Sequence, residues 1–384
     1  MNTDQVASSH ASQRAALIHR ETIQLGVLLL VAAAAFALTR TVAANNRAMT
    51  LRDAAEWYRR GRVQMEAGRT DEAVDSFRRA TVRDRNEKIY VLALAGALTS
   101  QGDFEPARSA LMTLREASPE DPDVNLLLAR LAAKRLDVTE ALRFYRNALY
   151  SPWPNDQAGT RRQVRIELVR FLLERGQPSR ALSELIALSA DIPDEPEAHL
   201  DVARLFGAAG DHRNALDQFQ RALRLSGENA EALAGAGQAA FELGDYTLAR
   251  TYLRRVPDKT ADIQSTLELV DLVLSNDPLA ARLGSAERRR RLTADLDHAR
   301  ERLRACLAQS GGTPAGNEGE AVQRETQAYL DQMQQQRILD QDTVEVGLDV
   351  IDRIERAVTD RCGPGTPLDQ ALLRIGRQHA GGAR

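Results

Sequence analysis

Two cysteines, Cys306 and Cys362, are the residues of this chain whose side chains could form a covalent cross-link. Each extends an apolar stripe of a predicted helix, one over about residues 285–309 and the other over 343–362. If these helices run in the same direction, with a third near 320–338 between them, the thiols meet at one end. A disulfide closing this loop of 57 residues would contribute on the order of 4 kcal/mol in the chain-entropy model and would require an oxidising compartment. Two buried free thiols are the alternative.

The other side chains able to do chemistry form no recognised catalytic or metal-binding pattern. The six histidines are scattered, and none has an acidic residue or second histidine at metal-ligand spacing. The chain has no zinc knuckle, no phosphate-binding glycine loop followed by lysine, and no serine nucleophile elbow. We therefore expect no catalytic residue, metal site, cofactor or small-molecule substrate, and we expect that the protein is not an enzyme.

A four-residue pattern returns six times between Gly68 and Val256 and organises the chain. Its second member is an alanine, at 73, 107, 141, 181, 215 and 249, so successive copies are 34, 34, 40, 34 and 34 residues apart. Such a period indicates stacked helix pairs, each unable to bury its apolar face alone. The glycine five residues before the alanine ends the first helix at a positive φ angle, and bulky residues after the alanine fill the space between units.

These copies resemble the tetratricopeptide repeat over about residues 54–258. The first copy matches best, through Trp57, Gly61, Gly68, Ala73, Phe77 and Ala80. Leu136 replaces the turn glycine of the third unit, and Asn125, Arg165 and His199 replace the leading apolar residue of the third, fourth and fifth. The resemblance implies an all-α superhelical solenoid of about six helix pairs whose first helices line a concave groove for a protein or peptide. The expected units are 54–87, 88–121, 122–155, 162–195, 196–229 and 230–258.

Arginine recurs eleven residues before the alanine in four of the six units, and an apolar residue stands four residues earlier. The predicted partner-binding groove comprises Tyr58, Arg62, Leu126, Arg130, Ile166, Arg170, Leu200 and Arg204. Because guanidinium groups donate forked hydrogen bonds to carboxylates, the two rows suit a peptide with acidic and apolar side chains. Ordinary solvation is the alternative, with Arg62 paired to Glu66 and Arg170 to Glu174 along their own helices.

The longer step between the third and fourth units contains the proline-rich segment 151–160, which cannot continue a helix. This segment is either a hinge between two blocks of three repeats or a binding loop that displays Trp153. The plainer interpretation is that Trp153 packs over the end of the third unit.

Residues 22–39 carry no charge, and as a helix they would rise about 27 Å, enough for a bilayer core. We expect a single-pass membrane anchor there, after a tail at 1–21 and before a polar linker at 40–53. A cleaved secretory signal is the alternative, because the apolar stretch is short and Ala43 and Ala44 follow it.

The charged residues do not decide the orientation of the anchor in the membrane, because basic residues flank it on both sides. A short tail before a large carboxy-terminal part, together with the cysteine argument, favours a bacterial inner membrane with the soluble part in the periplasm; a cytoplasmic orientation is the alternative. The whole chain has 51 basic and 54 acidic residues, a net charge of −3. Because this balance creates no field that attracts nucleic acid, we expect no nucleic-acid partner.

After Pro257 the period fails. We expect residues 259–283 to form a capping helix for the last unit and residues 284–384 to form a carboxy-terminal helical bundle. The whole pattern predicts a membrane-anchored scaffold that holds a protein or peptide partner in its groove, with cell-envelope assembly or export as its expected setting. The alternative is a regulator or enzyme whose activity lies in the carboxy-terminal helices, with the repeats as a targeting arm.

Overall fold

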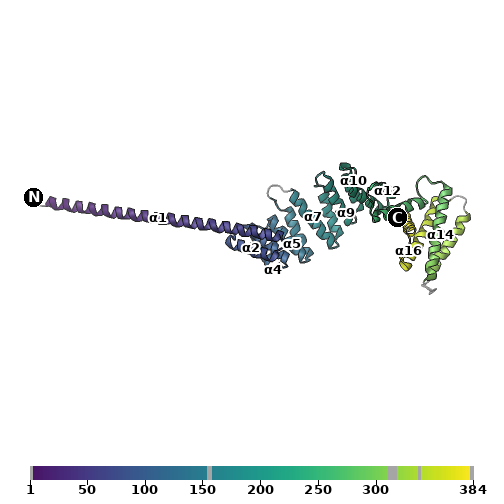
Figure 1. Cartoon of the computed structure of the whole chain (residues 1–384), viewed down its shortest axis with the longest axis horizontal. Coiled ribbons are helices and arrows are strands. Elements are labelled where there is room, and N and C mark those ends of the chain that lie inside the picture. The colour runs from purple at the N-terminus through teal and green to yellow at the C-terminus, as the bar shows by residue number, and fades with distance from the viewer. Residues whose placement is uncertain (1–2, 154–157, 310–317, 336–338, 381–384) are drawn as a thin grey trace. The chain divides into compact units, whose positions relative to one another are not determined.

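The computed structural model describes residues 3–153, 158–309, 318–335 and 339–380 (Figure 1). Over these residues the chain forms seventeen α-helices and no strand, so the predicted all-α class is confirmed. The chain divides into two compact units, Met1–Val164 and Arg165–Arg384. Residues 154–157, the centre of the predicted hinge, lie outside the described residues.

The helices are α1 Thr3–Glu66, α2 Thr70–Arg83, α3 Lys88–Gln101, α4 Phe104–Ala117, α5 Pro122–Lys134, α6 Val138–Tyr150, α7 Ala158–Glu174, α8 Pro178–Ser189, α9 Pro196–Ala208, α10 His212–Leu225, α11 Ala230–Glu242, α12 Tyr246–Arg255, α13 Ala261–Asn276, α14 Ser285–Gln309, α15 Glu318–Gln335, α16 Gln341–Cys362 and α17 Pro367–Ala380.

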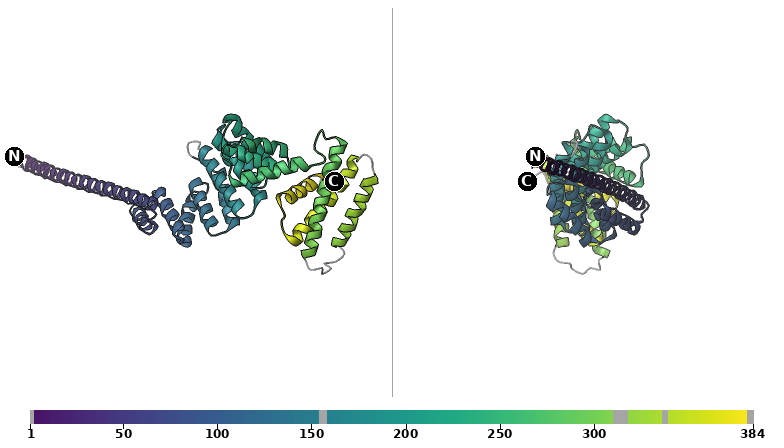
Figure 2. Two further views of the ribbon diagram at one scale, coloured as in Figure 1. Left: turned by 45° about the vertical axis from the view of Figure 1, so that its right-hand side comes forward. Right: turned by 90° about the vertical axis from the view of Figure 1, so that its left-hand side faces the viewer.

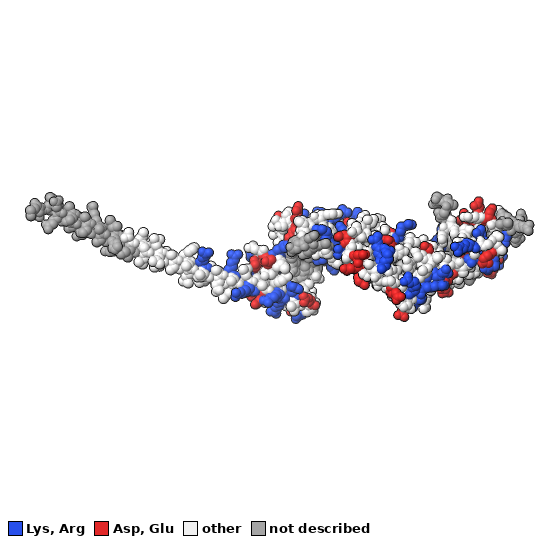
Figure 3. Space-filling view, turned by 90° about the horizontal axis from the view of Figure 1, so that it is seen from above, with Lys and Arg blue, Asp and Glu red and all other residues white. Residues whose placement is uncertain are grey.

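Helix α1 is one uninterrupted helix that contains the predicted anchor, the predicted linker and the first helix of the first repeat (Figure 1). The expected linker at 40–53 is helical, and it contains no glycine or proline that would end a helix. From Leu25 onward α1 is long and apolar enough to cross a membrane, with a mean hydropathy of 2.1 in its most apolar window. In the space-filling view this stretch is white, and basic side chains follow it (Figure 3).

The repeats are pairs of helices packed as the 34-residue period predicts. Within the first unit the end of α1 packs on α2, α3 on α4 and α5 on α6, and within the second unit α9 packs on α10 and α11 on α12. The six pattern alanines, at 73, 107, 141, 181, 215 and 249, are completely buried. A side chain on Gly61 would place its Cβ 2.6 Å from the ring of Phe77. The small residues therefore set the close approach of the two helices, as predicted.

The turn inside each repeat has the same backbone conformation whichever residue occupies it. Gly68, Gly102, Gly176, Gly210 and Gly244 all have positive φ angles. Leu136 takes the glycine position of the third repeat and still adopts φ +64°, a conformation that costs a residue with a Cβ about 1–2 kcal/mol. The packing of α5 on α6 therefore holds the turn in place against a local preference.

The polar residues that depart from the repeat pattern are paired inside their own repeats. Asn125 is fully buried, and its Nδ2 donates to the carbonyl oxygens of Pro119 and Asp121 at 2.9 Å. Arg165 lies 3.4 Å from Glu184 of α8, and His199 Nδ1 lies 2.8 Å from Gln218 Oε1 of α10. Each polar replacement on a first helix is thus matched by a partner, so the departures do not disrupt the stack.

Trp153 is buried, with 8% of its surface exposed, and its Nε1 donates to the carbonyl oxygen of Ala148 at 2.9 Å. Because Ala148 lies in α6, the ring covers the end of the third repeat. The plainer of the interpretations of this segment is therefore confirmed, and Trp153 is not displayed for binding.

The carboxy-terminal helices share one apolar core with the last repeat. This core runs from Phe241 and Tyr246 of the last repeat through Val270 of α13 to α14, α15, α16 and α17. Helices α14, α15 and α16 lie side by side, and α17 packs against both α16 and α13 (Figure 2). Helix α13 packs on α12, where a cap was predicted, but α17 contributes to the cover as well. The cap therefore includes α17 as well as α13.

Candidate functional site

The four arginines of the predicted groove lie on first helices and are exposed: Arg62 on α1, Arg130 on α5, Arg170 on α7 and Arg204 on α9. Arg62 and Arg130 belong to the first compact unit, and Arg170 and Arg204 to the second. Each position lies one residue after the small residue that packs against the second helix, so the arginine points away from that contact. Repeated packing therefore presents arginine at equivalent surface positions.

The apolar row that was expected beside the arginines does not offer a binding surface. Leu126, Ile166 and Leu200 are 8%, 9% and 1% exposed, and only Tyr58 is partly accessible. One helical turn before the arginine, the first helix faces the interior of the stack rather than solvent. The prediction that these leucine and isoleucine side chains contact a partner is therefore corrected, because their surface is already used by the core.

Arg62 and Arg204 have ion-pair partners within the array. Arg62 lies 3.5 Å from Glu66, which is the pairing along the helix that was considered. Arg204 lies 2.8 Å from Asp201 on its own helix and 3.1 Å from Glu231 on the first helix of the next repeat. The other pair of that alternative, between Arg170 and Glu174, does not occur among the ion pairs of the described residues. The exposed pairs are weak, so a partner carboxylate can compete for these arginines.

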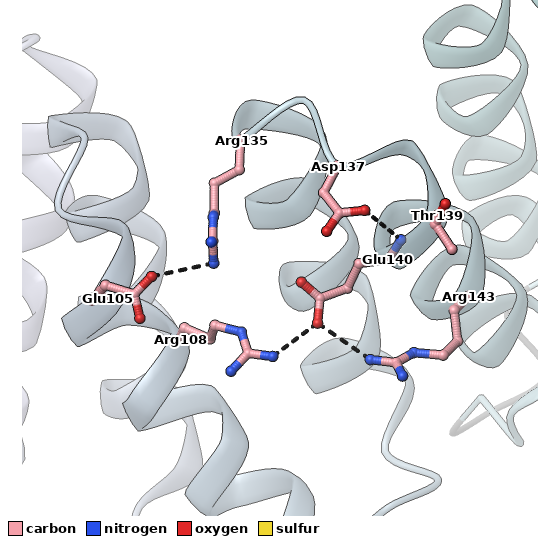
Figure 4. Close-up of a pocket in the computed structure, with 7 residues that line it drawn as sticks. All are labelled: Glu105, Arg108, Arg135, Asp137, Thr139, Glu140 and Arg143. Atoms are coloured by element: carbon pink, nitrogen blue, oxygen red, sulfur yellow. Dashed lines mark hydrogen bonds and ion pairs between the residues drawn. The ribbon is translucent and has the colours of Figure 1, made fainter.

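A cavity of about 460 Å³ lies between the second and third repeats of the first unit, lined by Glu105, Arg108, Arg135, Asp137, Thr139, Glu140 and Arg143 (Figure 4). Arg108 and Arg143 both donate to Glu140, at 2.9 and 3.2 Å, and Arg135 lies 3.3 Å from Glu105. The hydrogen bond with Glu140 raises the pKa of Arg108. Since each arginine lining this cavity has an acidic partner, the cluster joins adjacent repeats and needs no ligand to balance its charge.

Sequence reasoning missed these contacts between repeats, although a signal for them exists. Arg108 and Glu140 are 32 residues apart, and Lys88 bonds Asp121 at 2.7 Å across 33 residues. Opposite charges separated by about one period lie on equivalent parts of neighbouring repeats. A search for such pairs would have found them.

The two cysteines are joined by a disulfide in the structure, with a Cα–Cα distance of 6.0 Å. Cys306 is in the last turn of α14 and Cys362 ends α16, so the bond links two helices at the same end. Cys306 is 5% exposed, whereas Cys362 is exposed. The arrangement of the three longer helices that was expected from sequence therefore accounts for the meeting of the thiols.

A buried charge cluster is centred on Arg302, which lies one helical turn before Cys306 on α14. Arg302 of α14 forms an ion pair with the fully buried Glu355 of α16 and lies 3.4 Å from Asp369 of α17. His298 Nε2 lies 2.7 Å from Asp369 Oδ1, and Thr366 N donates to Asp369 Oδ2 at 2.6 Å. Burial opposes ionisation of Asp369, but the hydrogen bonds from His298 and Thr366 hold its pKa below the ordinary value. The cluster connects α14, α16 and α17 through charge-assisted hydrogen bonds.

Two histidines of the carboxy-terminal helices have partners that their sequence positions did not indicate. His298 and Asp369 are 71 residues apart, and His379 lies 3.2 Å from Asp277. Among the described residues, no group of three or more histidine, cysteine or acidic side chains is arranged to hold a metal ion. These histidines therefore join helices.

Comparisons with known proteins place the repeats in a family. Two tetratricopeptide repeat family models match, one at residues 30–88 and 200–262 and the other at residues 64–131. No curated protein matches the chain.

Solved structures with similarity include YrrB, described as a TPR protein with an unusual peptide-binding site (19% identity, TM-score 0.37, 50% of this chain and 93% of that chain). Others are pilF of Pseudomonas aeruginosa (17%, 0.40, 57% and 97%) and PilW, described as a widely conserved type IV pilus biogenesis factor (18%, 0.40, 56% and 98%). At such low identity and TM-score, these structures indicate nothing about the partner of this chain.

The conclusion about family rests on the repeats themselves. Paired helices recur along the array with completely buried alanines and positive-φ turns at equivalent places, and the matches of the two family models overlap this array. This chain is a tetratricopeptide repeat protein.

Proposed function

We propose that this protein is a non-catalytic scaffold, held at a membrane by α1, that binds an acidic segment of a protein partner on the first helices of its repeats. The observation that carries the proposal is the exposed arginine at one equivalent position in four repeats: Arg62, Arg130, Arg170 and Arg204. Arginine at an equivalent surface position of several repeats is what an acidic segment lying along the first helices of a unit would meet.

The burial of the apolar row narrows the class of partner. Because Leu126, Ile166 and Leu200 are enclosed in the core, the partner gains little from apolar side chains at those positions. Arginine donates two parallel hydrogen bonds to a carboxylate and keeps its charge at every physiological pH. Aspartate and glutamate side chains are therefore the groups that we expect the partner to present, and binding should weaken as salt screens the charges.

The continuity of α1 supports a close connection between the membrane and the array. Residues 40–53 are helical and lead into the first repeat without an interruption. At a rise of 1.5 Å per residue, this segment holds the first repeat about 20 Å from the end of the apolar stretch. A tether of this kind keeps the array near membrane proteins and their juxtamembrane segments.

The disulfide supports placing the soluble part on the oxidising side of the membrane, because such bonds persist outside the reducing cytoplasm. Thiol counting on protein extracted from its native membrane, before and after reduction, tests this placement. We expect titratable thiols only after reduction. Two reactive thiols before reduction would contradict export. The intact mass of the same sample shows whether residues 22–39 are retained as an anchor.

The groove is tested by placing a photocrosslinking amino acid at Gln238, which occupies the arginine position in the last repeat and is exposed. Crosslinked partners captured in the native membrane are identified and compared with those of a variant in which Arg130, Arg170 and Arg204 are replaced by glutamate. We expect the variant to lose at least nine-tenths of the specific crosslink, because three attractive contacts become repulsive.

A matched control reverses three exposed arginines on second helices: Arg78, Arg143 and Arg221. Each of them pairs with an acidic residue three or four positions earlier on its own helix, at 3.2, 3.2 and 3.0 Å. The control carries the same change in net charge and leaves the first helices intact. Equal crosslinking by the two triple variants, with both arrays still helical, would contradict the proposed binding surface.

A further inference from the structure

The disulfide lies directly before α17. Cys362 ends α16, and after it the chain turns through Gly363, at φ +86°, into α17. Cys306 holds this point to the end of α14. The covalent bond therefore fixes the place from which α17 starts.

The first turn of α17 is held to α14 by the side chain one turn before Cys306. Arg302 Nη2 donates to the carbonyl oxygen of Gly363 at 3.1 Å, and Arg302 Nε lies 3.4 Å from Asp369 Oδ2. The same guanidinium pairs with Glu355, which is completely buried, and the Arg302 side chain itself is only 14% exposed. This pair depends on the ends of α14 and α16 staying together, because separated buried charges are strongly unfavourable.

The other part of α17 covers the end of the repeat array. The guanidinium carbon of Arg374 lies 4.0 Å from the centre of the Phe241 ring, and Arg374 and Tyr246 line the same cavity. Phe241 lies in the last turn of α11 and Tyr246 begins α12, so both belong to the last repeat. Leu372 and Ile375 are buried in the same core. Helix α17 thus covers a face that a further repeat would otherwise cover.

We propose that the disulfide between Cys306 and Cys362 is a redox-controlled latch, and that its reduction by a dithiol releases α17 from the last repeat. This inference goes beyond the proposed scaffold function and does not depend on the arginine surface. Release would expose Phe241 and Tyr246, which are 4% and 6% exposed in the oxidised protein.

The chemistry is a two-electron exchange with a dithiol reductant. A thiolate of the dithiol attacks Sγ of Cys362, because this cysteine is exposed whereas Cys306 is 5% exposed. The bond between the two protein sulfurs breaks, and Cys306 leaves as a thiolate that takes up a proton. The second thiol of the reductant then displaces Cys362, so two protein thiols and one oxidised dithiol result.

Reduction removes the closure of a loop whose ends are 56 positions apart. In the chain-entropy model this closure changes the equilibrium between folded and open chain by on the order of a thousandfold. After reduction the ends of α14 and α16 stay together only through the Arg302 cluster and apolar packing. We expect the opening of α17 to become at least tenfold more frequent.

Hydrogen–deuterium exchange of the full chain in detergent, with and without dithiothreitol, tests the proposal. We expect amides of residues 367–380 to exchange at least tenfold faster after reduction, with amides of α9 and α10 unchanged. The Cys306→Ser/Cys362→Ser variant should show the fast exchange without reductant and no response to it. Reduction of the folded wild-type protein gives the same information if this variant does not fold.

The variant Arg374→Met separates the latch from general loosening of the bundle. It removes the contact of the guanidinium with the Phe241 ring and keeps the disulfide, so α17 should exchange faster while α14 does not. Unchanged exchange of α17 in wild-type protein whose two thiols have become alkylatable would overturn the proposal. Equal acceleration of α14, α16 and α17 on reduction would also overturn it, because the bond would then be a structural cross-link of the whole bundle.

Discussion

Replacing Asp295 by asparagine should stabilise the carboxy-terminal helices increasingly as the pH rises from 5 to 7.5. Asp295 lies on α14 with 3% of its surface exposed, and its Oδ2 has no hydrogen-bond partner among the described residues. Burial raises the pKa of Asp295 from 3.8 to about 7, against the opposing charge of Arg291. The folded protein therefore binds a proton that the unfolded chain has already released.

The sign and size of the effect follow from this difference. Protonation of Asp295 favours the folded state fully below about pH 4, and this stability is lost as the pH rises toward 7. At 1.36 kcal/mol per pKa unit, a shift of about 3 units amounts to about 4 kcal/mol, of which about 2.5 kcal/mol is lost between pH 5 and 7.5. Asparagine cannot ionise, and its incompletely bonded amide costs about 1 kcal/mol at every pH.

Native-state hydrogen exchange of α14, corrected for the intrinsic pH dependence of exchange, measures the opening free energy of this helix. The stability difference between the Asp295→Asn variant and the wild type should grow by about 2.5 kcal/mol from pH 5 to 7.5. Burial also raises the pKa of Glu355 to about 7, and this residue is present in both proteins, so the comparison isolates Asp295.

The matched control is Asp297→Asn, two positions along α14, where the side chain is 55% exposed. This variant should follow the wild-type pH dependence. Identical pH profiles for the Asp295→Asn variant and the wild type would refute the reasoning, because they would show that the carboxyl titrates alike in the folded and unfolded chains.

Three further predictions concern the array, each checked by thermal and urea unfolding of the purified chain. Gly210→Leu should reduce the free energy of unfolding by about 1–2 kcal/mol. The loss comes from the φ angle of +79° alone, because no atom lies within 4 Å of the added Cβ. Leu136→Gly should change the stability by less than about 1 kcal/mol, and equal effects of the two variants would contradict the backbone argument. Gly61→Leu should cost about 1–3 kcal/mol through its clash with Phe77, and Phe77→Leu should relieve part of the loss. Trp153→Ala should cost about 3 kcal/mol, and a loss under 1 kcal/mol would show that the ring is not a structural cover.

The parts of the fold that could be predicted from the sequence are those set by contacts within one repeat or between adjacent repeats. The alanines and turn glycines repeat because each helix pair packs on an adjacent copy of itself, so one local rule appears six times in the chain. Trp153 follows the same logic, since its contact is five residues away. Residues 40–53 contain no glycine or proline, and this was the one indication in the sequence that α1 continues through them, because polar residues alone do not end a helix.

The sequence by itself determined the all-helical class, the period of the array and the surface position of its arginines, because these follow from residues within one repeat. Only the tertiary structure decided that Leu126, Ile166 and Leu200 face inward, that Arg302 joins three helices, and that α17 returns to cover Phe241. The contacts of Arg302 and of α17 join residues far apart in the chain, where no period relates them. Their physical basis is the burial of charge and apolar surface between elements whose approach depends on the whole fold.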